Sequence, residues 1–256
     1  MTELKNLLSA FEPITLAEMD GVKLMDRVDT KYVFSSALLP DILEKMKSDY
    51  RLLEIDTIRL HRYESLYYDT PDFKLYAKHQ RGILNRWKFR FRKYVDSAGL
   101  TFFELKFKNN KARTIKSRTK VHEVVLNEGN KAAVFLNETT PFSAASLEPK
   151  MWVNYSRMTF VNKFSEERLT MDVNLNYIRA NDNQNISFPH MVIAEAKRAN
   201  ASYISSFIRM VRRNGIREGS ISKYCFGIYN LFDSVKKNNF KPRVRFIHKM
   251  AATKQI

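Results

Sequence analysis

The sequence predicts an α+β fold: a single domain built on a mostly antiparallel sheet, with its clearest helices near the two ends of the chain. Three observations support this prediction. Segments in which charged and apolar residues alternate follow one another through the middle of the chain, as half-buried strands do. Helical spacing of apolar residues is clearest toward the termini. No segment is rich enough in Gly, Ser or Pro to indicate a linker between domains.

The N-terminal third predicts short helices and two extended segments. Residues 1–26 are mildly acidic and predict one or two short helices, and the alternation in 27–34 predicts a strand. A helix is expected over 38–48, followed by an extended, tyrosine-rich segment at 58–68. Thr70 is then expected to cap a short helix, because a proline and an aspartate follow it at the first helical positions.

The rest of the chain predicts mostly strands and then helices. Three strands follow in a row between residues 84 and 126, with a turn at 96–99 between the first two. Further strands are expected at 150–164, 166–173 and 190–197. Helices are expected at 129–137, from Ile204 to a stop at Gly215, and at 222–234.

The predicted organisation is an N-terminal helical segment at 1–20, one domain at 21–234 and a basic C-terminal tail at 235–256. The last 20-odd residues carry seven Lys and Arg and no acidic residue. We expect this tail to be loosely ordered.

Composition narrows the class of protein. The 256 residues include 44 Lys and Arg against 27 Asp and Glu, a formal net charge of +17, and 12% of them are aromatic. A chain this aromatic is not a disordered basic tail, and no apolar run approaches the roughly 18–20 residues of a membrane span. The N-terminus lacks the features of a secretory signal, and the single cysteine, Cys225, suits a reducing compartment. We therefore expect a cytoplasmic protein with an anionic partner.

The positive charge is concentrated in three predicted strands. Residues 86–120 hold twelve Lys and Arg against two acids, a net +10 of the +17. In the first strand every second residue is basic (Arg86, Lys88, Arg90 and Arg92), so all four share one face, opposite Trp87, Phe89 and Phe91. The next two strands repeat the pattern. A solvated sheet face normally mixes both signs of charge, so rows of like charge indicate an anionic ligand.

A few carboxylates lie among these cations. Glu195 and Lys197 share a face of one predicted strand, and Arg168 and Asp172 share a face of another. Cations that bind phosphate oxygens, together with isolated carboxylates that hold a divalent metal, are the arrangement expected for a phosphate ligand with its metal ion.

At this point the sequence resembles a known family. The resemblance rests on nine segments, which occur in this order: RVDTKY, SLYYDTPDFKLYAKH, RWKFRFRKY, FFELKFK, TIKSRTKV, NYSRMTF, RLTMDVN, IAEAK and SKYC. They are similar to the VTC-type polyphosphate polymerase domain, a branch of the CYTH/triphosphate tunnel metalloenzyme superfamily, over about residues 20–232. The resemblance implies an antiparallel eight-stranded β-barrel that forms a triphosphate tunnel, with flanking helices.

The resemblance also implies roles for individual residues. The phosphate ligands would be Lys31, Arg90, Arg92, Lys106, Lys116, Arg157, Arg168 and Lys223. Glu195 matches the metal-binding glutamate for Mn²⁺ or Mg²⁺, and Glu104 and Asp172 are further metal candidates. Arg118 and Lys197 are further candidates for binding the substrate.

The activity that the resemblance implies is transfer of the γ-phosphoryl group of ATP to a growing polyphosphate chain. No glycine-rich phosphate loop occurs, so ATP would be recognised through its triphosphate. The superfamily's Glu-x-Glu-x-Lys motif reads Arg27-x-Asp29-x-Lys31 here, which argues against the hydrolytic branch. Regulation, and attachment to the inner face of a membrane, are expected to come from separate proteins.

Two other functions stay open. A triphosphatase would release phosphate from ATP or tripolyphosphate in the same tunnel. A non-catalytic module would only bind a polyanion. Nucleic acid is the less favoured polyanion, because the aromatic residues lie mostly opposite the cations, whereas single-strand binders stack bases beside their basic groove.

Overall fold

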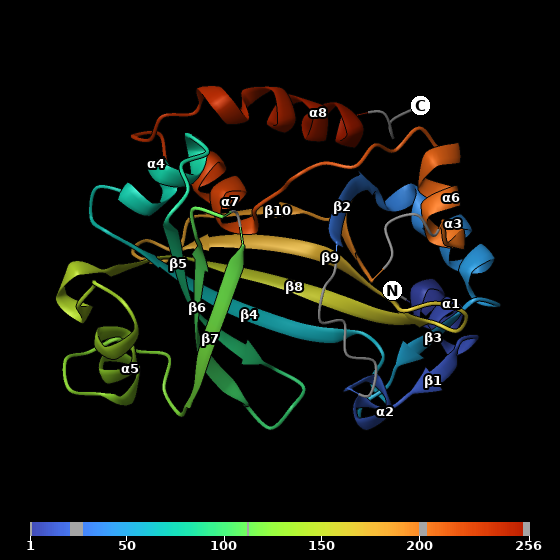
Figure 1. The fold of residues 1–256 in the computed structure, drawn as a ribbon. Coiled ribbons are helices and arrows are strands. Elements are labelled where there is room, and N and C mark those ends of the chain that lie inside the picture. Colours follow the sequence, from blue (N-terminus) through green and yellow to red (C-terminus); the bar gives the residue numbers. More distant parts are fainter. Residues whose placement is uncertain (1, 21–27, 112, 200–203, 253–256) are drawn as a thin grey trace.

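The computed structural model describes residues 2–20, 28–111, 113–199 and 204–252, and its centre is one large sheet (Figure 1). Eight main strands follow each other in the sheet, and each is antiparallel to its neighbours. In sheet order they are β2 (Val28–Ser35), β11 (Met191–Arg198), β9 (Glu167–Arg179), β8 (Glu148–Asn162), β4 (His61–Asp69), β5 (Arg86–Tyr94), β6 (Thr101–Lys108) and β7 (Thr114–Val121). The predicted α+β class and antiparallel pairing are confirmed.

Short strands and helices surround this sheet. The short strands are β1 (Glu12–Ile14), β3 (Tyr50–Leu53) and β10 (Asn185–Phe188). The helices are α1 (Thr2–Ser9), α2 (Leu16–Asp20), α3 (Leu39–Met46), α4 (Lys74–Gln80), α5 (Lys131–Thr139), α6 (Ser206–Arg213), α7 (Lys223–Leu231) and α8 (Lys241–Ala252). Helices α1, α3 and α6 gather at one end of the sheet, and α4, α7 and α8 cover another part of it (Figure 1).

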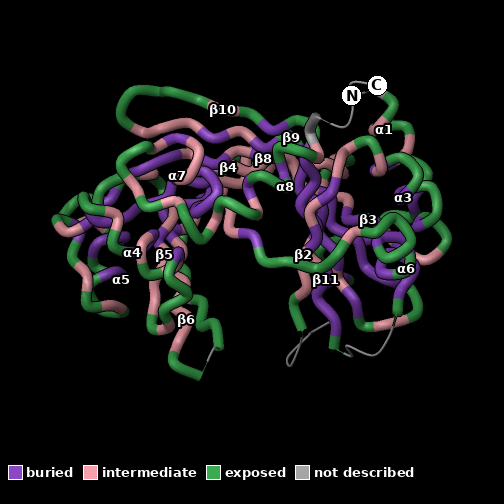
Figure 2. The backbone as a smooth tube through the Cα atoms, turned by 90° about the horizontal axis from the view of Figure 1, so that it is seen from above, coloured by how far each residue is buried: buried purple, intermediate pink, exposed green. Residues whose placement is uncertain are grey.

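The sheet is strongly curved but not closed. Its end strands, β2 and β7, do not pair with each other among the described residues, and Figure 2 shows the β2–β11 side and the β5–β6 side apart. The eight strands have the antiparallel arrangement expected of the tunnel-forming barrel, but among the described residues the sheet does not close. The free edge of β2 is partly satisfied by the segment before α7, because the Gly219 amide donates to the Lys31 carbonyl oxygen at 2.8 Å.

The outer face of β5 and β6 carries one part of the apolar core. Phe89 and Phe91 on β5, with Phe103 on β6, are fully buried in a cluster that includes Ala133 and Leu136 of α5. This confirms the alternation predicted for residues 86–92, since burial of the aromatic face leaves the basic side chains on the concave face. Burying those rings supplies much of the stabilisation of this half of the sheet.

Helix α7 packs directly on β8 and β9. A Cβ atom added at Gly227 would lie 2.5 Å from Cδ1 of Tyr177 and 2.6 Å from Sδ of Met151. The missing side chain therefore lets the helix approach the sheet closely. This close approach places the first turn of α7 on the concave side of the sheet, where the predicted site residues lie.

The structure corrects several expectations. The basic C-terminal segment is not loosely ordered throughout: it contains α8, whose Val244 and Ile247 are only 5% and 1% exposed and pack beside α7. The helix expected after Thr70 begins later, at Lys74, because Phe73 adopts a left-handed conformation (φ 58°). Strands β1, β3 and β10 were not predicted. Arg27 lies outside the described residues.

Candidate active site

The concave face of the sheet encloses a cavity of about 490 Å³. Side chains from all eight main strands and from the start of α7 line it. The thirteen predicted site residues all lie there: Lys31, Arg90, Arg92, Glu104, Lys106, Lys116, Arg118, Arg157, Arg168, Asp172, Glu195, Lys197 and Lys223. The structure thus brings together residues that are up to 192 positions apart in the chain, and their individual roles stay predictions.

Strand register arranges the cations of β5, β6 and β7 in two cross-strand rows. The rows are Arg90–Glu104–Arg118 and Lys88–Lys106–Lys116. In the first row Arg90 contacts Glu104, with 2.6 Å between its Nε and Oε2 of the carboxylate. Burial alone would raise the pKa of Glu104, but Arg90 and Arg92 lower it to about 2. Glu104 is therefore ionised at neutral pH and neutralises part of this row.

A second carboxylate, Asp172, holds two cations from different elements. Arg157 on β8 donates to both of its oxygens, at 2.6 Å and 2.9 Å, and Lys223 on α7 also donates to it. Burial alone would raise the pKa of Asp172, but Arg157 and Lys223 lower it well below its ordinary value. Asp172, which is buried, thus forms an ion-pair cluster with two partly buried cations that line the cavity.

The third carboxylate, Glu195 on β11, lies between two lysines. Lys197 donates to Oε2, whereas Lys31 on β2 approaches Oε1 only to 3.5 Å. Burial would raise the pKa of Glu195, but Lys197 and Lys31 lower it. Burial lowers the pKa of Lys197 to about 8, against the opposing effect of Glu195. Lys197 therefore titrates close to physiological pH.

Among the described residues, two members of the lysine row lack such a carboxylate partner. No ion pair found among the described residues includes Lys88 or Lys106, and Lys88 Nζ donates instead to Oγ of Ser222, at 2.9 Å. Burial, followed by repulsion from Arg90 and other nearby cations, holds the pKa of Lys106 well below its ordinary value. An anion bound beside this row would relieve that repulsion.

The start of α7 adds further positive potential. Ser222 caps the helix by accepting from the Cys225 amide at 3.3 Å, and the next residue is Lys223. Both line the cavity, so the positive end of the helix dipole meets the same space as the cations.

Sequence reasoning missed five polar residues of the cavity. They are Tyr67, Lys88, Ser117, Tyr155 and Ser222. Lys88 belongs to the same alternating row as Arg90, so its spacing could have identified it. The hydroxyls of Tyr67 and Tyr155 accept from Arg90 and Arg92, each at 2.9 Å. Tyr67 on β4 and Tyr155 on β8 are thus exceptions to the expectation that the aromatic residues lie mostly opposite the cations.

The donor set limits how a metal ion could be held. Among the described residues, no group of three or more His, Cys, Asp or Glu side chains is placed to hold a metal ion. Mg²⁺ and similar ions need only one or two carboxylates when phosphate oxygens complete their shell. Both oxygens of Asp172 are occupied by cations, whereas Oε1 of Glu195 has only the 3.5 Å contact. The site fits a metal held by Glu195 together with a bound phosphate.

Comparison with known proteins agrees with this architecture. The family model described as "VTC domain" matches residues 26–232. A proposed adenylate cyclase from Bacillus halodurans has a similar fold, with a TM-score of 0.50 and 13% identity over 82% of this chain and 100% of that one. A proposed adenylyl cyclase from Hippeastrum, described as having a dominant triphosphatase activity, has a TM-score of 0.51 and 12% identity over 80% of this chain and 96% of that one.

At these identities the two structures show a shared fold. No curated protein sequence is significantly similar to this chain. Within the described part of the chain, we find no helix with the length and apolarity needed to cross a membrane.

Proposed function

This chain belongs to the VTC domain family, and we propose that it transfers the γ-phosphoryl group of ATP to the end of a growing polyphosphate chain. The observation that carries this proposal is the row Lys88–Lys106–Lys116, which lines a cavity together with further cations from β2, β5, β7, β8, β9, β11 and α7. Like charges that lie close together and are partly buried, as Lys88 and Lys106 are, destabilise a fold unless an anion compensates them. A chain of phosphates carries a series of negative charges, so it can compensate the lysine row better than a single carboxylate could.

The cavity chemistry suits phosphoryl transfer to a phosphate acceptor. An oxygen of the terminal phosphate attacks the γ-phosphorus, one P–O bond forms, the bond to the β-phosphate breaks, and ADP leaves. The attacking oxygen is already ionised at neutral pH, so the reaction needs no general base. None of the described residues that line the cavity is a histidine or a cysteine. Positioning and charge neutralisation are then the work of the Lys and Arg side chains.

The arginines and lysines have different parts in this proposal. Arg90, Arg92 and Arg157 are held in place by tyrosine hydroxyls or carboxylates, so a phosphate would meet guanidinium groups whose orientation is already fixed. Lys106 and Lys88 act as point charges along the polyphosphate chain. In this proposal the arginines contact the reacting phosphates, and the lysines of the row contact the rest of the polyphosphate chain.

Glu195 would hold Mn²⁺ or Mg²⁺, which, when bound, neutralises charge on the phosphates of the substrate. Lys31 and Lys197 flank Glu195, so a phosphate that binds them lies next to the same carboxylate. The divalent metal, the cytoplasmic location and a separate membrane partner all stay predictions.

A triphosphatase is the second candidate, because the fold is shared with the Hippeastrum protein described as a triphosphatase. The test is to incubate purified protein with ATP and Mn²⁺ and to separate the products. Polymer on a gel supports the polymerase, free phosphate alone supports the triphosphatase, and binding without turnover supports a polyanion-binding module.

Two variants sharpen this test. Lys106→Ala should abolish product formation, because it removes the centre of the lysine row. Lys45→Ala is the matched control, because Lys45 lies on the exposed face of α3 and pairs with Asp41. Equal activity of both variants and the wild type would overturn the proposed site.

A further inference from the structure

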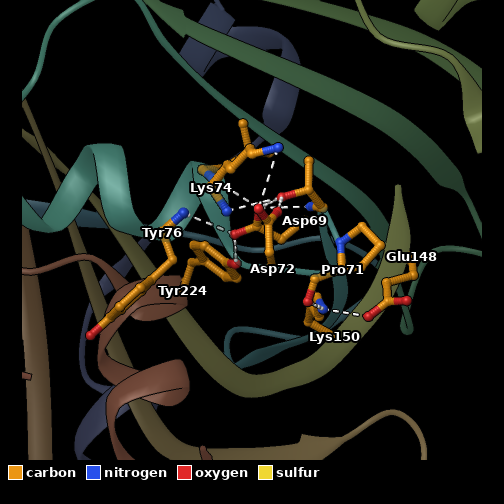
Figure 3. Close-up of polar contacts among 10 residues, drawn as sticks. Asp69, Pro71, Asp72, Lys74, Tyr76, Glu148, Lys150 and Tyr224 are labelled. Atoms are coloured by element: carbon orange, nitrogen blue, oxygen red, sulfur yellow. Dashed lines mark hydrogen bonds and ion pairs between the residues drawn. The ribbon is translucent and has the colours of Figure 1, made fainter. Parts of the chain in front are cut away.

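A buried carboxylate outside the cavity is hydrogen-bonded to α7, the helix that borders the cavity. Asp69, at the end of β4, is 0% exposed and accepts hydrogen bonds from the backbone amides of Thr70, Leu75 and Tyr76 at 2.7–2.9 Å. The hydroxyl of Tyr224 also donates to it (Figure 3). The loop after β4, the start of α4 and the first turn of α7 therefore meet at one carboxylate.

Tyr224 fixes the rotation of α7 about its axis. It is the second residue of the helix and is 2% exposed. Its ring stacks on that of Tyr67, with 5.2 Å between ring centroids and 22° between planes. If the helix turned, it would break this stack and leave the carboxylate of Asp69 without one of its donors, which is costly in a buried site.

The two residues before Tyr224 reach opposite walls of the cavity. Ser222 accepts from Lys88 on β5, and Lys223 donates to Asp172 on β9. Successive helix residues point about 100° apart. A Tyr224 side chain fixed in the core therefore directs Lys223 toward the cavity, and the first turn of α7 spans the gap between two strands that are not neighbours in the sheet.

We propose that Asp69 and Tyr224 are positioning residues, which act through the first turn of α7 to hold Ser222 and Lys223 in the cavity. Neither is among the described residues that line it. The identity of the anion that Lys223 contacts rests on the proposed function. The position of Lys223 itself does not depend on that function.

The test uses Tyr224→Phe, which keeps the stacked ring and removes only the hydroxyl. With tripolyphosphate as the probe, calorimetry should give a dissociation constant about tenfold weaker than that of the wild type, the scale of a displaced charged hydrogen bond. If Tyr224 acts through Lys223, the double variant with Lys223→Ala should bind no more weakly than Lys223→Ala alone. Full additivity of the two changes would overturn the proposal.

Tyr76→Phe is the matched control. It also removes a hydrogen bond of a buried tyrosine, from its hydroxyl to the Lys236 carbonyl oxygen at 2.9 Å, but Tyr76 lies on α4. We expect it to lower the melting temperature without changing tripolyphosphate affinity. The same pattern for Tyr224→Phe, lower stability with unchanged affinity, would show a purely structural role.

Two further measurements separate this inference from the proposed function. If the wild type fails to bind tripolyphosphate, the proposed function is wrong, and a crystal structure of Tyr224→Phe decides the positioning by itself. Lys223 displaced from Asp172 supports the inference, and Lys223 in place overturns it. If Tyr224→Phe does not fold, Asp69→Asn is subjected to the same measurements, with the same expected loss of affinity.

Discussion

Arg157 and Asp172 face each other across β8 and β9 in a two-point ion pair, with 2.6 Å from Nε to Oδ1 and 2.9 Å from the second guanidinium nitrogen to Oδ2. Glu104 and Glu195 have comparable relations with Arg90 and Lys197. Each carboxylate of the cavity thus holds cations in place. Under the proposed function, a phosphate chain would compete with these carboxylates for the same side chains, so the carboxylates would affect affinity as well as folding.

The first prediction concerns this ion pair. Arg157→Ala leaves Asp172 buried with Lys223 alone, and we expect the free energy of unfolding to fall by about 3–5 kcal/mol, as when one partner of a buried pair is removed. Urea denaturation measures this change. Arg62→Ala is the control, because Arg62 makes a similar contact with Asp96 but its side chain is 64% exposed. Equal losses in the two variants would contradict the buried-pair interpretation.

Lys106→Met should separate stability from binding. The folded-state pKa of Lys106 is lowered, so the folded protein disfavours the charged form, and removing the charge should raise the melting temperature of the ligand-free protein. The same change should weaken tripolyphosphate binding about tenfold or more.

The pH dependence of stability in Lys106→Met and in the wild type tests whether the charge of Lys106 destabilises the folded protein. The unfolded chain retains the Lys106 proton up to higher pH than the folded chain does. Wild-type stability should therefore rise with pH as the folded-state Lys106 loses its proton, and the Met variant should lack this contribution. Thermal denaturation of both proteins over a pH series measures the difference, and a Met variant less stable than the wild type at neutral pH would refute the prediction.

A pH dependence of binding follows from Lys197. Its pKa is lowered to about 8, so between pH 7 and 9 it loses the proton with which it would contact phosphate. Tripolyphosphate affinity of the wild type should fall across this range relative to that of Lys197→Arg, whose guanidinium stays charged. Using one ligand for both proteins cancels the titration of the ligand itself. Parallel profiles would show that Lys197 does not bind the phosphate.

The strands of the site were predictable because their sequences alternate strictly. In Arg86–Arg92, a period of two both predicts a strand and assigns its faces, and burial of Phe89 and Phe91 confirms the assignment. β3 escaped prediction because three of its four residues are buried, which removes the alternation. The sequence of α8 likewise predicts a charged, loosely ordered tail, because its basic residues hide the fact that Ile247 is buried in the fold.

The partners inside the site were less predictable than its members. Nothing in the sequence pairs Asp172 with Lys223, because that contact depends on how α7 docks on β9. Tyr67 lies on the cationic face because its register opposite Arg90 puts it there, and register is a property of the folded sheet. The sequence thus predicts which charges gather, whereas the tertiary fold decides which of them neutralise one another.

Metal dependence is tested at Glu195. Glu195→Gln should lose the Mn²⁺-dependent part of ATP turnover, because an amide is a weaker ligand for a divalent ion than a carboxylate. Metal-free tripolyphosphate binding should not weaken, since Lys31 and Lys197 are released from the carboxylate. Calorimetry with Mn²⁺ or with a chelator measures both effects. Glu64→Gln is the control, because Glu64 on β4 contacts Lys93 and does not line the cavity. Full metal-dependent turnover in Glu195→Gln would exclude Glu195 as the metal ligand.

The last prediction concerns α8, where the structure departs from the sequence-based expectation of a loosely ordered tail. Ile247 is 1% exposed in the cluster that also contains Tyr224, whereas Phe246, its neighbour on the helix, is 55% exposed. Ile247→Ala should therefore lower the free energy of unfolding by about 2–4 kcal/mol, and Phe246→Ala by less than about 0.5 kcal/mol. Because α8 packs beside α7, Ile247→Ala should also lower tripolyphosphate affinity slightly. Equal and small losses of stability in the two variants would mean that α8 does not pack on the domain in solution.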